Sequence, residues 1–237
     1  MDNTGGDRSR HPMVSVVIPA WNEESRIADS VRQFEGLPGA WERIVVDGGS
    51  GDRTLERARK AGAEIVARAP RGRAAQMNHG AGLASGRFLL FLHADVLLPR
   101  DAHALVVRAL RGEAVAGCFR TWTESSGSGL RRAVVHLADL RSRYTSLPYG
   151  DQALFVSAAR FTEVGGFPEV PLFEDLELSR RLKARGRLVT LPASVRVSGR
   201  RFDAGLVRAT LLINLLPLAY WAGVPVGFLE RLYGSPR

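Results

Sequence analysis

The sequence predicts an α/β domain with a mostly parallel central sheet flanked by helices, followed by an apolar helical appendix. Short apolar runs alternate with segments of helical spacing through the first half of the chain. This alternation favours right-handed βαβ crossovers and parallel strands. Because no Pro-, Gly- or Ser-rich linker divides the chain, we expect one domain over residues 13–202. A disordered tail (1–12) precedes it, and the appendix (203–237) follows.

The first half is expected to contain four strands separated by helices. We expect the first strand to stop before Pro19, which has no N–H to donate. The expected strands cover residues 14–18, 43–46, 64–67 and 88–92. The expected helices cover residues 23–34, 53–61 and 73–84.

The second half is more mixed and ends in a long apolar stretch. Helices are expected at 101–110, 127–140 and 174–185, and strands at 114–122, 152–157 and 187–198. Residues 211–229 are apolar enough to raise the question of a transmembrane span, but prolines and glycines interrupt them. We therefore expect two short helices split near residues 223–225. These helices would pack on the domain, pair with a second subunit, or lie on a membrane surface.

The charge balance indicates a phosphorylated ligand more than a nucleic acid. Net charge is +9, with 33 Lys+Arg against 24 Asp+Glu, and almost all the cations are arginines. Arginine favours bidentate contact with phosphate. The arginines are scattered and not interleaved with aromatic residues, which disfavours nucleic-acid binding. The single cysteine, Cys118, excludes an intrachain disulfide and a Cys-based metal site, so we expect a cytoplasmic protein.

Three polar clusters follow predicted strands, at residues 19–23, 47–52 and 93–95. The carboxyl ends of parallel strands share one edge of a sheet, so these clusters should converge. Arg71 and Arg73, just before a helix, offer guanidinium groups to a diphosphate at the same edge. The alternative is that the clusters are ordinary turns and the arginines surface charges.

His93 and Asp95 are the most informative of these residues. At i and i+2 on an extended strand end, their side chains leave on the same side. Two such groups can share a divalent cation and its phosphate ligand. A charged loop after a core strand is the alternative.

Glu174 and Asp175 start a predicted helix in the second half. The helix dipole alone favours carboxylates at that position. The functional interpretation is a general base that deprotonates an acceptor hydroxyl. Arg200 and Arg201, after the last strand, could stabilise a leaving diphosphate, or they could be surface arginines.

The motifs VSVVIPAWNEE, IVVDGGSGDRT, GRAAQMNHGAGLASGRFLLFLHAD and GGFPEVPLFEDLELSRRL occur in this order. Together they resemble the family 2 glycosyltransferases with the GT-A (Rossmann-like) fold, from Val14 to about Arg201. The resemblance implies a nucleoside-diphospho-sugar donor, a divalent cation (Mn or Mg), and transfer with inversion to a hydroxyl acceptor.

The resemblance also implies roles for individual residues. Asp95 would coordinate the metal as the last carboxylate of the family's Asp-x-Asp motif, and Asp175 would be the base with Glu174 beside it. His93 departs from the family, which usually has Asp there, and imidazole suits Mn²⁺ better than Mg²⁺. The donor would be held by Pro19, Ala20, Glu23 and Asp47 at the nucleoside, and by Arg71 and Arg73 near the diphosphate or base.

The short chain resembles a compact bacterial subgroup that ends in a Ser-Gly-Arg-Arg segment and an apolar tail. Members have been associated with arsenosugar biosynthesis, and relatives with carotenoid glycosylation. The acceptor would be lipid-like or a small metabolite, and the enzyme cytoplasmic or peripheral at the inner face of the membrane. Two other classes stay open: a sugar-phosphate nucleotidyltransferase and a non-catalytic membrane-surface binding module. The sequence shows no Gly-rich activation loop with lysine near the N-terminus, which counts against the nucleotidyltransferase.

Overall fold

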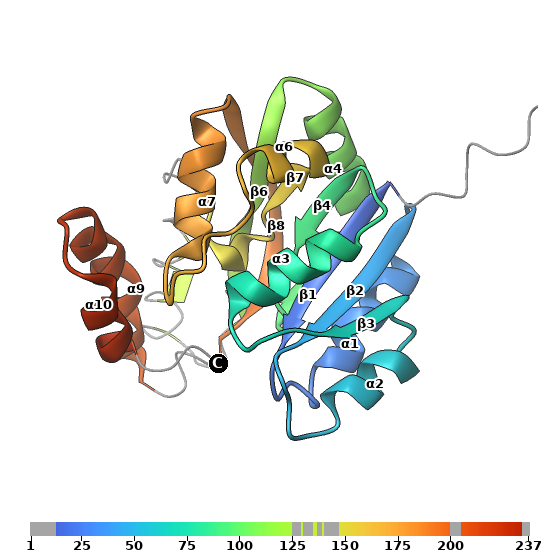
Figure 1. Ribbon diagram of the computed structural model, residues 1–237, viewed down its shortest axis with the longest axis horizontal. Coiled ribbons are helices and arrows are strands. Elements are labelled where there is room, and N and C mark those ends of the chain that lie inside the picture. Colours follow the sequence, from blue (N-terminus) through green and yellow to red (C-terminus); the bar gives the residue numbers. More distant parts are fainter. Residues whose placement is uncertain are drawn as a thin grey trace, which may run out of the picture.

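The computed structural model describes residues 13–124, 129, 135–136, 139, 147–199 and 205–233. It contains one eight-stranded sheet in the order β3-β2-β1-β4-β7-β6-β8-β5, with helices on both faces (Figure 1). The expected tail (1–12), most of the helix expected at 127–140, and Arg200 and Arg201 lie outside the described residues.

The first four strands of the chain pair in parallel, as predicted. They are β1 (Val14–Ala20), β2 (Trp41–Asp47), β3 (Ile65–Arg68) and β4 (Phe88–Phe91). Strand β1 lies between β2 and β4, and every residue in it is buried. Its alternate side chains therefore contribute to two different cores.

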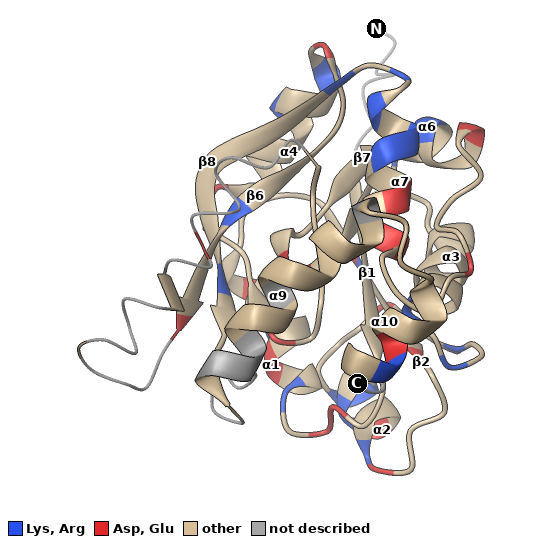
Figure 2. Ribbon diagram, turned by 90° about the vertical axis from the view of Figure 1, so that its left-hand side faces the viewer, with Lys and Arg blue, Asp and Glu red and all other residues tan. Residues whose placement is uncertain are grey.

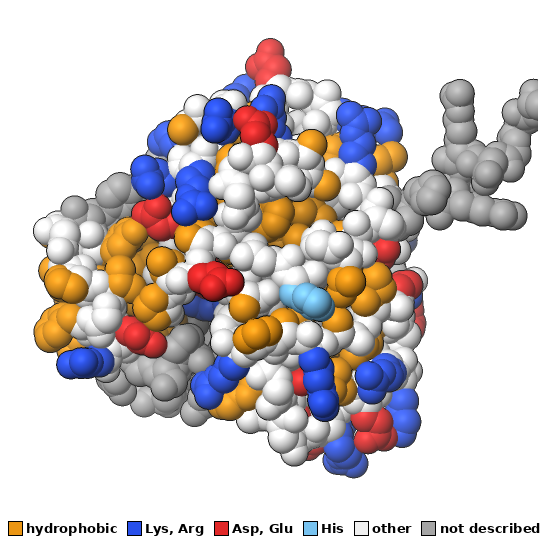
Figure 3. Space-filling model, in the orientation of Figure 1, with side chains coloured by type: hydrophobic (Ala, Val, Ile, Leu, Met, Phe, Trp, Pro, Cys, Tyr) orange, Lys and Arg blue, Asp and Glu red, His pale blue; other side chains and the backbone are white. Residues whose placement is uncertain are grey.

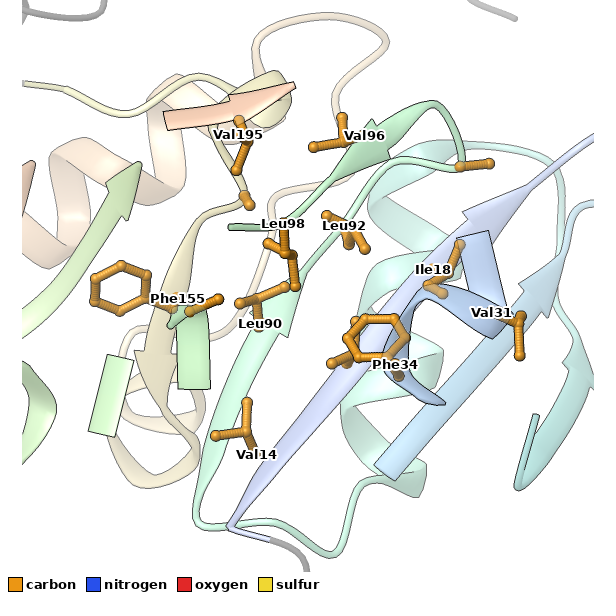
Figure 4. Packing of buried hydrophobic residues seen from close by; sticks show 14 of the residues in the cluster. Val14, Ile18, Val31, Phe34, Leu90, Leu92, Val96, Leu98, Phe155 and Val195 are labelled. Carbon is orange, nitrogen blue, oxygen red and sulfur yellow. The ribbon is translucent and has the colours of Figure 1, made fainter. Parts of the chain in front are cut away.

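The first core lies under α1 (Ile27–Arg32), α2 (Thr54–Lys60) and α4 (Ala102–Arg111). Figure 4 shows Val14, Ile18, Leu90 and Leu92 of this core facing Phe34, which belongs to the 3-10 turn η1 (Gln33–Gly36). The second core, on the opposite face, lies under α3 (Arg73–Leu83), α6 (Ala158–Glu163) and α7 (Glu174–Lys183). The domain is thus a helix–sheet–helix sandwich.

The second half of the sheet mixes directions. Strand β7 (Phe155–Ser157) pairs antiparallel with β4 and with β6 (Ala114–Glu124). Strand β8 (Arg187–Ser198) runs parallel to β6 through two register shifts. The short strand β5 (Val96–Leu97) pairs antiparallel with β8, which brings the segment after β4 to the far side of the sheet.

Several predicted boundaries were wrong for identifiable reasons. Strand β1 continues through Pro19. The Val17 carbonyl points toward β4, and Pro19, two residues later, faces the same side. Because the pairing with β4 ends at Val17 and Phe91, no backbone N–H is needed from Pro19. The helix expected at 23–34 begins only at Ile27. The strand expected at 152–157 starts late, because Ala153 has a left-handed backbone (φ 49°) after the 3-10 turn η2 (Gly150–Gln152).

The C-terminal stretch forms two helices, as predicted: α9 (Leu206–Trp221) and α10 (Val226–Tyr233). They lie side by side (Figure 2) and pack on the start of α7 through Leu172, Phe173 and Leu176. No helix among the described residues is long and apolar enough to span a bilayer. Apolar side chains gather on the outside of this helix pair (Figure 3); the exposed ones are Leu211, Leu215, Leu218, Phe228 and Leu232.

The packing of α3 on the sheet gives a test of the fold. A Cβ on Gly80 would lie 2.4 Å from Cγ1 of Val17, whereas a Cβ on Gly82 of the same helix would meet nothing within 4 Å. Gly80→Ala should lower the free energy of unfolding by about 1–3 kcal/mol through overpacking. Gly82→Ala should leave it unchanged or raise it by up to about 1 kcal/mol. Urea denaturation of both variants measures the difference, and equal effects would contradict this packing.

Candidate active site

The loops after β1 and β2 are joined by hydrogen bonds. The Asn22 backbone N–H donates to Ser50 Oγ (2.8 Å), and the Gly51 N–H donates to Asn22 Oδ1 (2.9 Å). The Glu23 N–H donates to Thr54 Oγ1 (2.9 Å). The loop before α1 is therefore held against the loop after β2. The predicted convergence of the first two strand-end clusters is therefore present.

Gln76 of α3 fixes the strand ends beneath these loops. Its side chain is 3% exposed, and its Nε2 donates to the carbonyl oxygens of Ala20 and Val46, both at 2.8 Å. A Cβ on Gly48 would lie 3.1 Å from the Gln76 side chain, so the loop passes close above it. Sequence reasoning missed Gln76. The available signal was a polar residue in the apolar face between Ala74 and Met77.

Asp47 is fully buried and shapes its own loop. Its carboxylate accepts hydrogen bonds from the N–H groups of Gly49 (3.1 Å) and Ser50 (3.0 Å) and from the Ser50 hydroxyl. Such local bonds are the usual way in which Asp closes a turn. The expected contact of Asp47 with a nucleoside stays a prediction.

The other expected donor residues surround the same loops. Pro19 and Ala20 are buried, and the Ala20 carbonyl already accepts from the Gly48 N–H (2.9 Å). Arg71 is exposed and stacks on Trp21, with its Cζ 3.6 Å from the ring centroid. This cation–π contact ties the segment before α3 to the loop after β1.

Arg73, the first residue of α3, joins the two halves of the domain. Its Nε lies 2.9 Å from Oε1 of Glu174, the first residue of α7. Next to Glu174, Asp175 Oδ2 accepts from the Gly150 N–H (2.5 Å) and Oδ1 accepts from the Leu176 N–H (2.8 Å).

The start of α7 is held in a strained backbone. Phe173, directly before Glu174, has φ 69°, which is rare for an aromatic residue. Upstream, Asn78 of α3 donates from Nδ2 to the Phe167 carbonyl (2.8 Å) and accepts the Phe167 N–H (2.9 Å). Helix α3 therefore fixes both the Gly165-Gly166-Phe167 loop and, through Arg73, the carboxylates that follow it.

Burial controls the protonation of these carboxylates. It raises the pKa of Glu174 to about 7, with Arg73 opposing and Asp175 adding to the shift. Burial also raises the pKa of Asp175, against the opposing effect of Arg73 and of the N–H groups that it accepts. For Arg73, burial lowers the pKa, but the two carboxylates more than offset this and raise it. Since the guanidinium keeps its proton, proton uptake near neutral pH falls on the carboxylates.

Gly150 brings the two predicted halves of the site together. A Cβ built on Gly150 would lie 3.0 Å from His93 Nε2 and 3.2 Å from Asp175 Oδ2. His93 and Asp175 therefore approach the same face of Gly150, the face on which a side chain would stand. Asp95 is half-buried, and its carbonyl accepts the N–H of Ser198 at the end of β8 (3.2 Å).

The candidate metal ligands fit a cation that binds together with a substrate phosphate. Among the described residues, no group of three or more His, Cys, Asp or Glu side chains is placed to hold a metal ion. His93 and Asp95 lie in a turn after β4, closed by the Val96 N–H donating to the His93 carbonyl (3.1 Å), and not on an extended strand end as predicted. They are the two candidate ligands. Mg²⁺ sites are commonly completed by substrate phosphates and water around one or two carboxylates. The residues present fit that arrangement and not an all-protein metal cage.

Arg73, His93 and Asp175, which the sequence analysis assigned to the diphosphate, the metal and the base, line one pocket. The pocket also contains Asp151, which sequence reasoning missed because only its neighbours in the fold distinguish it. Apolar residues of α9 and the segment before α7 form the rest of the wall. The full lining is Arg73, His93, Tyr149, Gly150, Asp151, Leu172, Phe173, Asp175, Leu212, Leu216, Pro217 and Tyr233.

Comparison with known proteins identifies the family. The model of glycosyl transferase family 2 matches residues 15–159. The chain belongs to glycosyltransferase family 2. It is 32% identical over 161 residues to undecaprenyl-phosphate 4-deoxy-4-formamido-L-arabinose transferase of Pseudomonas aeruginosa, covering 62% of this chain and 47% of that protein. The Salmonella choleraesuis enzyme of the same name is 30% identical over 160 residues, with 62% and 48% covered. The chain thus spans about half the length of these curated relatives.

Solved structures confirm the predicted GT-A fold. A mannosyltransferase from Pyrobaculum calidifontis, in complex with GDP-Man and Mn²⁺, has a TM-score of 0.70 at 21% identity, covering 95% of this chain and 69% of that one. Glucosyl-3-phosphoglycerate synthase from Mycobacterium tuberculosis, with Mg²⁺ and UDP, has a TM-score of 0.60 at 20% identity, covering 90% and 80%. Family membership and fold both agree with the prediction of a family 2 glycosyltransferase domain.

The buried ion pair predicts how stability depends on pH. Because the folded state raises the pKa of Glu174, it holds that proton more tightly than the unfolded chain, so stability falls as pH rises toward 7. From about pH 5 to about pH 8, wild type should lose roughly 2–3 kcal/mol through this group, a loss that Glu174→Gln removes. Urea denaturation at both pH values measures it.

Glu56→Gln is the matched control, because Glu56 forms an exposed pair with Lys60 on α2. Its pH slope should follow wild type. A Glu174→Gln protein with the wild-type slope would contradict the raised pKa.

Proposed function

We propose that this glycosyltransferase moves a sugar from a nucleoside-diphospho-sugar to an acceptor hydroxyl, with inversion and with the assistance of a divalent cation. The observation that carries the proposal is Asp175. It is a partly buried carboxylate with a raised pKa, and it lines a pocket together with His93 and the guanidinium of Arg73. This pocket lies beside the strand-end edge where α/β proteins bind nucleotides.

The donor is assigned to the loops after β1 and β2. Arg71 and Trp21 form a flat, cationic surface there, and Asp47 holds its loop in shape. Pro19, Ala20 and Glu23 are proposed to lie against the nucleoside and Arg73 near the diphosphate, with Arg200 and Arg201 adding charge to it. Structures similar to this chain contain GDP-Man or UDP, which supports a nucleotide donor.

Asp175 is the proposed general base. The N–H groups of Gly150 and Leu176 orient its carboxylate, and a pKa raised toward neutrality improves proton transfer at physiological pH. Glu174 acts indirectly, since its ion pair with Arg73 anchors the turn that carries Asp175. Single displacement by an acceptor deprotonated on the face opposite the diphosphate inverts the anomeric carbon.

Asp95 and His93 are the proposed holders of a divalent cation, Mn²⁺ or Mg²⁺. Such a cation supplies Lewis-acid neutralisation of charge on the departing diphosphate. Similar structures that contain Mn²⁺ or Mg²⁺ support this assignment. The imidazole of His93 favours Mn²⁺.

The proposed acceptor and location follow from the named relatives and from the apolar C-terminal helices. Relatives named as undecaprenyl-phosphate transferases support an acceptor connected with lipid. The compact-subgroup resemblance instead suggests arsenosugar or carotenoid acceptors. We propose a cytoplasmic enzyme, peripheral on the membrane or self-associating through α9 and α10.

Asp175→Asn should reduce transfer at least about 100-fold while sparing donor binding, because it removes the base and keeps the shape. Release of nucleoside diphosphate measures transfer, and calorimetry measures donor affinity. Asp29→Asn, an exposed change on α1, is the control. Wild-type turnover in Asp175→Asn would contradict the assignment of Asp175 as the base.

Asp95→Asn should remove the metal-dependent part of donor binding. We expect UDP-glucose, UDP-GlcNAc or GDP-mannose to raise the melting temperature of wild type more with Mn²⁺ or Mg²⁺ than with chelator. The variant should give the chelator value throughout. Asp101→Asn, an exposed change just before α4, should behave as wild type. A full metal-dependent shift in Asp95→Asn would refute its role.

A further inference from the structure

The pocket beside Asp175 has two chemically different surfaces. One is polar and contains Arg73, His93, Asp151 and Asp175. The other is built from hydrocarbon and aromatic groups: Tyr149, Leu172, Phe173, Leu212, Leu216, Pro217 and Tyr233. A ligand that matches both surfaces needs a polar end and an apolar body.

The polar surface has an unused acceptor. Asp151 Oδ1 is buried and has no hydrogen-bond partner among the described residues. Both oxygens of Asp175, in contrast, accept backbone N–H groups. Buried polar atoms without a partner are rare in native proteins because they cost free energy. A ligand hydroxyl that donates to Asp151 Oδ1 would satisfy it, and would place that hydroxyl on the polar surface that Asp151 shares with Asp175.

Helix α9 contributes Leu212, Leu216 and Pro217 to the apolar surface. Leu212 and Leu216 are one helical turn apart, and both pack in the cluster that contains Leu172 and Phe173. Leu216 is buried, but Leu212 is partly exposed and lines the pocket. A sugar or other polyhydroxy acceptor would leave this wall without a matching partner. A hydrocarbon chain would gain up to about fourfold in affinity for each methylene that it buries.

We propose that the pocket is the acceptor site and that its ligand is an amphipathic alcohol, an inference that rests on the proposed function. The hydroxyl lies between Asp151 and Asp175, and the hydrocarbon part packs against Leu212 and Leu216. The acceptor oxygen bonds to the anomeric carbon as the bond from that carbon to the phosphate oxygen breaks. The bonding pair leaves on the nucleoside diphosphate, and the hydroxyl proton goes to Asp175.

A series of primary alcohols tests the proposal. Ethanol, 1-butanol, 1-hexanol and 1-octanol share one hydroxyl and stay monomeric at low millimolar concentration. Each is given to wild type with a donor found by the thermal-shift screen, and alkyl glycoside and nucleoside diphosphate are measured. KM should fall along the series by up to about fourfold per methylene. Glycerol should be a poor acceptor.

Two variants and one matched control assign the surfaces. Leu212→Asn should abolish most of the chain-length preference. Leu211→Asn, next to it but on the exposed side of α9, should keep the preference. Asp151→Asn should raise KM for every alcohol by a similar factor, because it alters the contact with the shared hydroxyl. Equal KM values for ethanol and 1-octanol, or an unchanged preference in Leu212→Asn, would overturn the proposal.

Saturation-transfer NMR of 1-octanol and ethanol separates this inference from the proposed function, because it needs no donor. Selective, Leu212-dependent binding of 1-octanol without any donor turnover would support the acceptor pocket and count against the transfer reaction. Donor turnover with glycerol, without selective octanol binding, would support the reaction and overturn the amphipathic acceptor.

Discussion

The parallel pairing of β1 with both β2 and β4 is the constraint on which the rest of the molecule depends. Its register sets Ala20 opposite Asp47 and Val17 opposite Phe91, so three buried strands end close together. Their loops must then share one edge of the sheet. Gln76 holds two of these strand ends at a fixed spacing, and the cross-loop hydrogen bonds of Asn22 and Glu23 follow from that spacing.

The Arg73–Glu174 ion pair is the second important constraint, because it holds the start of α3 next to the start of α7. It links the first residue of α3 to the first residue of α7, and so adds a side-chain contact between the two halves of the chain. Burying charged groups is unfavourable unless they are paired. Burial therefore destabilises the charged form of Glu174 and raises its pKa, even though Arg73 is its partner. The same burial gives Asp175 the environment expected of a general base.

The sequence was sufficient for features that depend on periodicity and on strand ends. It predicted the four parallel strands and the break between α9 and α10, and it assigned roles in one reaction to Arg73, His93 and Asp175, which line one pocket. It was insufficient where tertiary contacts decide. Strand β5 is too short to show a period, and Pro19 stays in β1 only because β4 ends earlier. Gln76 and Asp151 are polar residues that acquire meaning only from their neighbours in the fold.

The site divides its charged groups by type. On the proposed assignment, the donor side relies on the guanidinium groups of Arg71 and Arg73, which stay protonated throughout the physiological range. The acceptor side relies on carboxylates whose pKa values burial has raised. On that assignment, acidification would protonate the base while the arginine contacts to the donor stay charged, so transfer would slow before those contacts are lost.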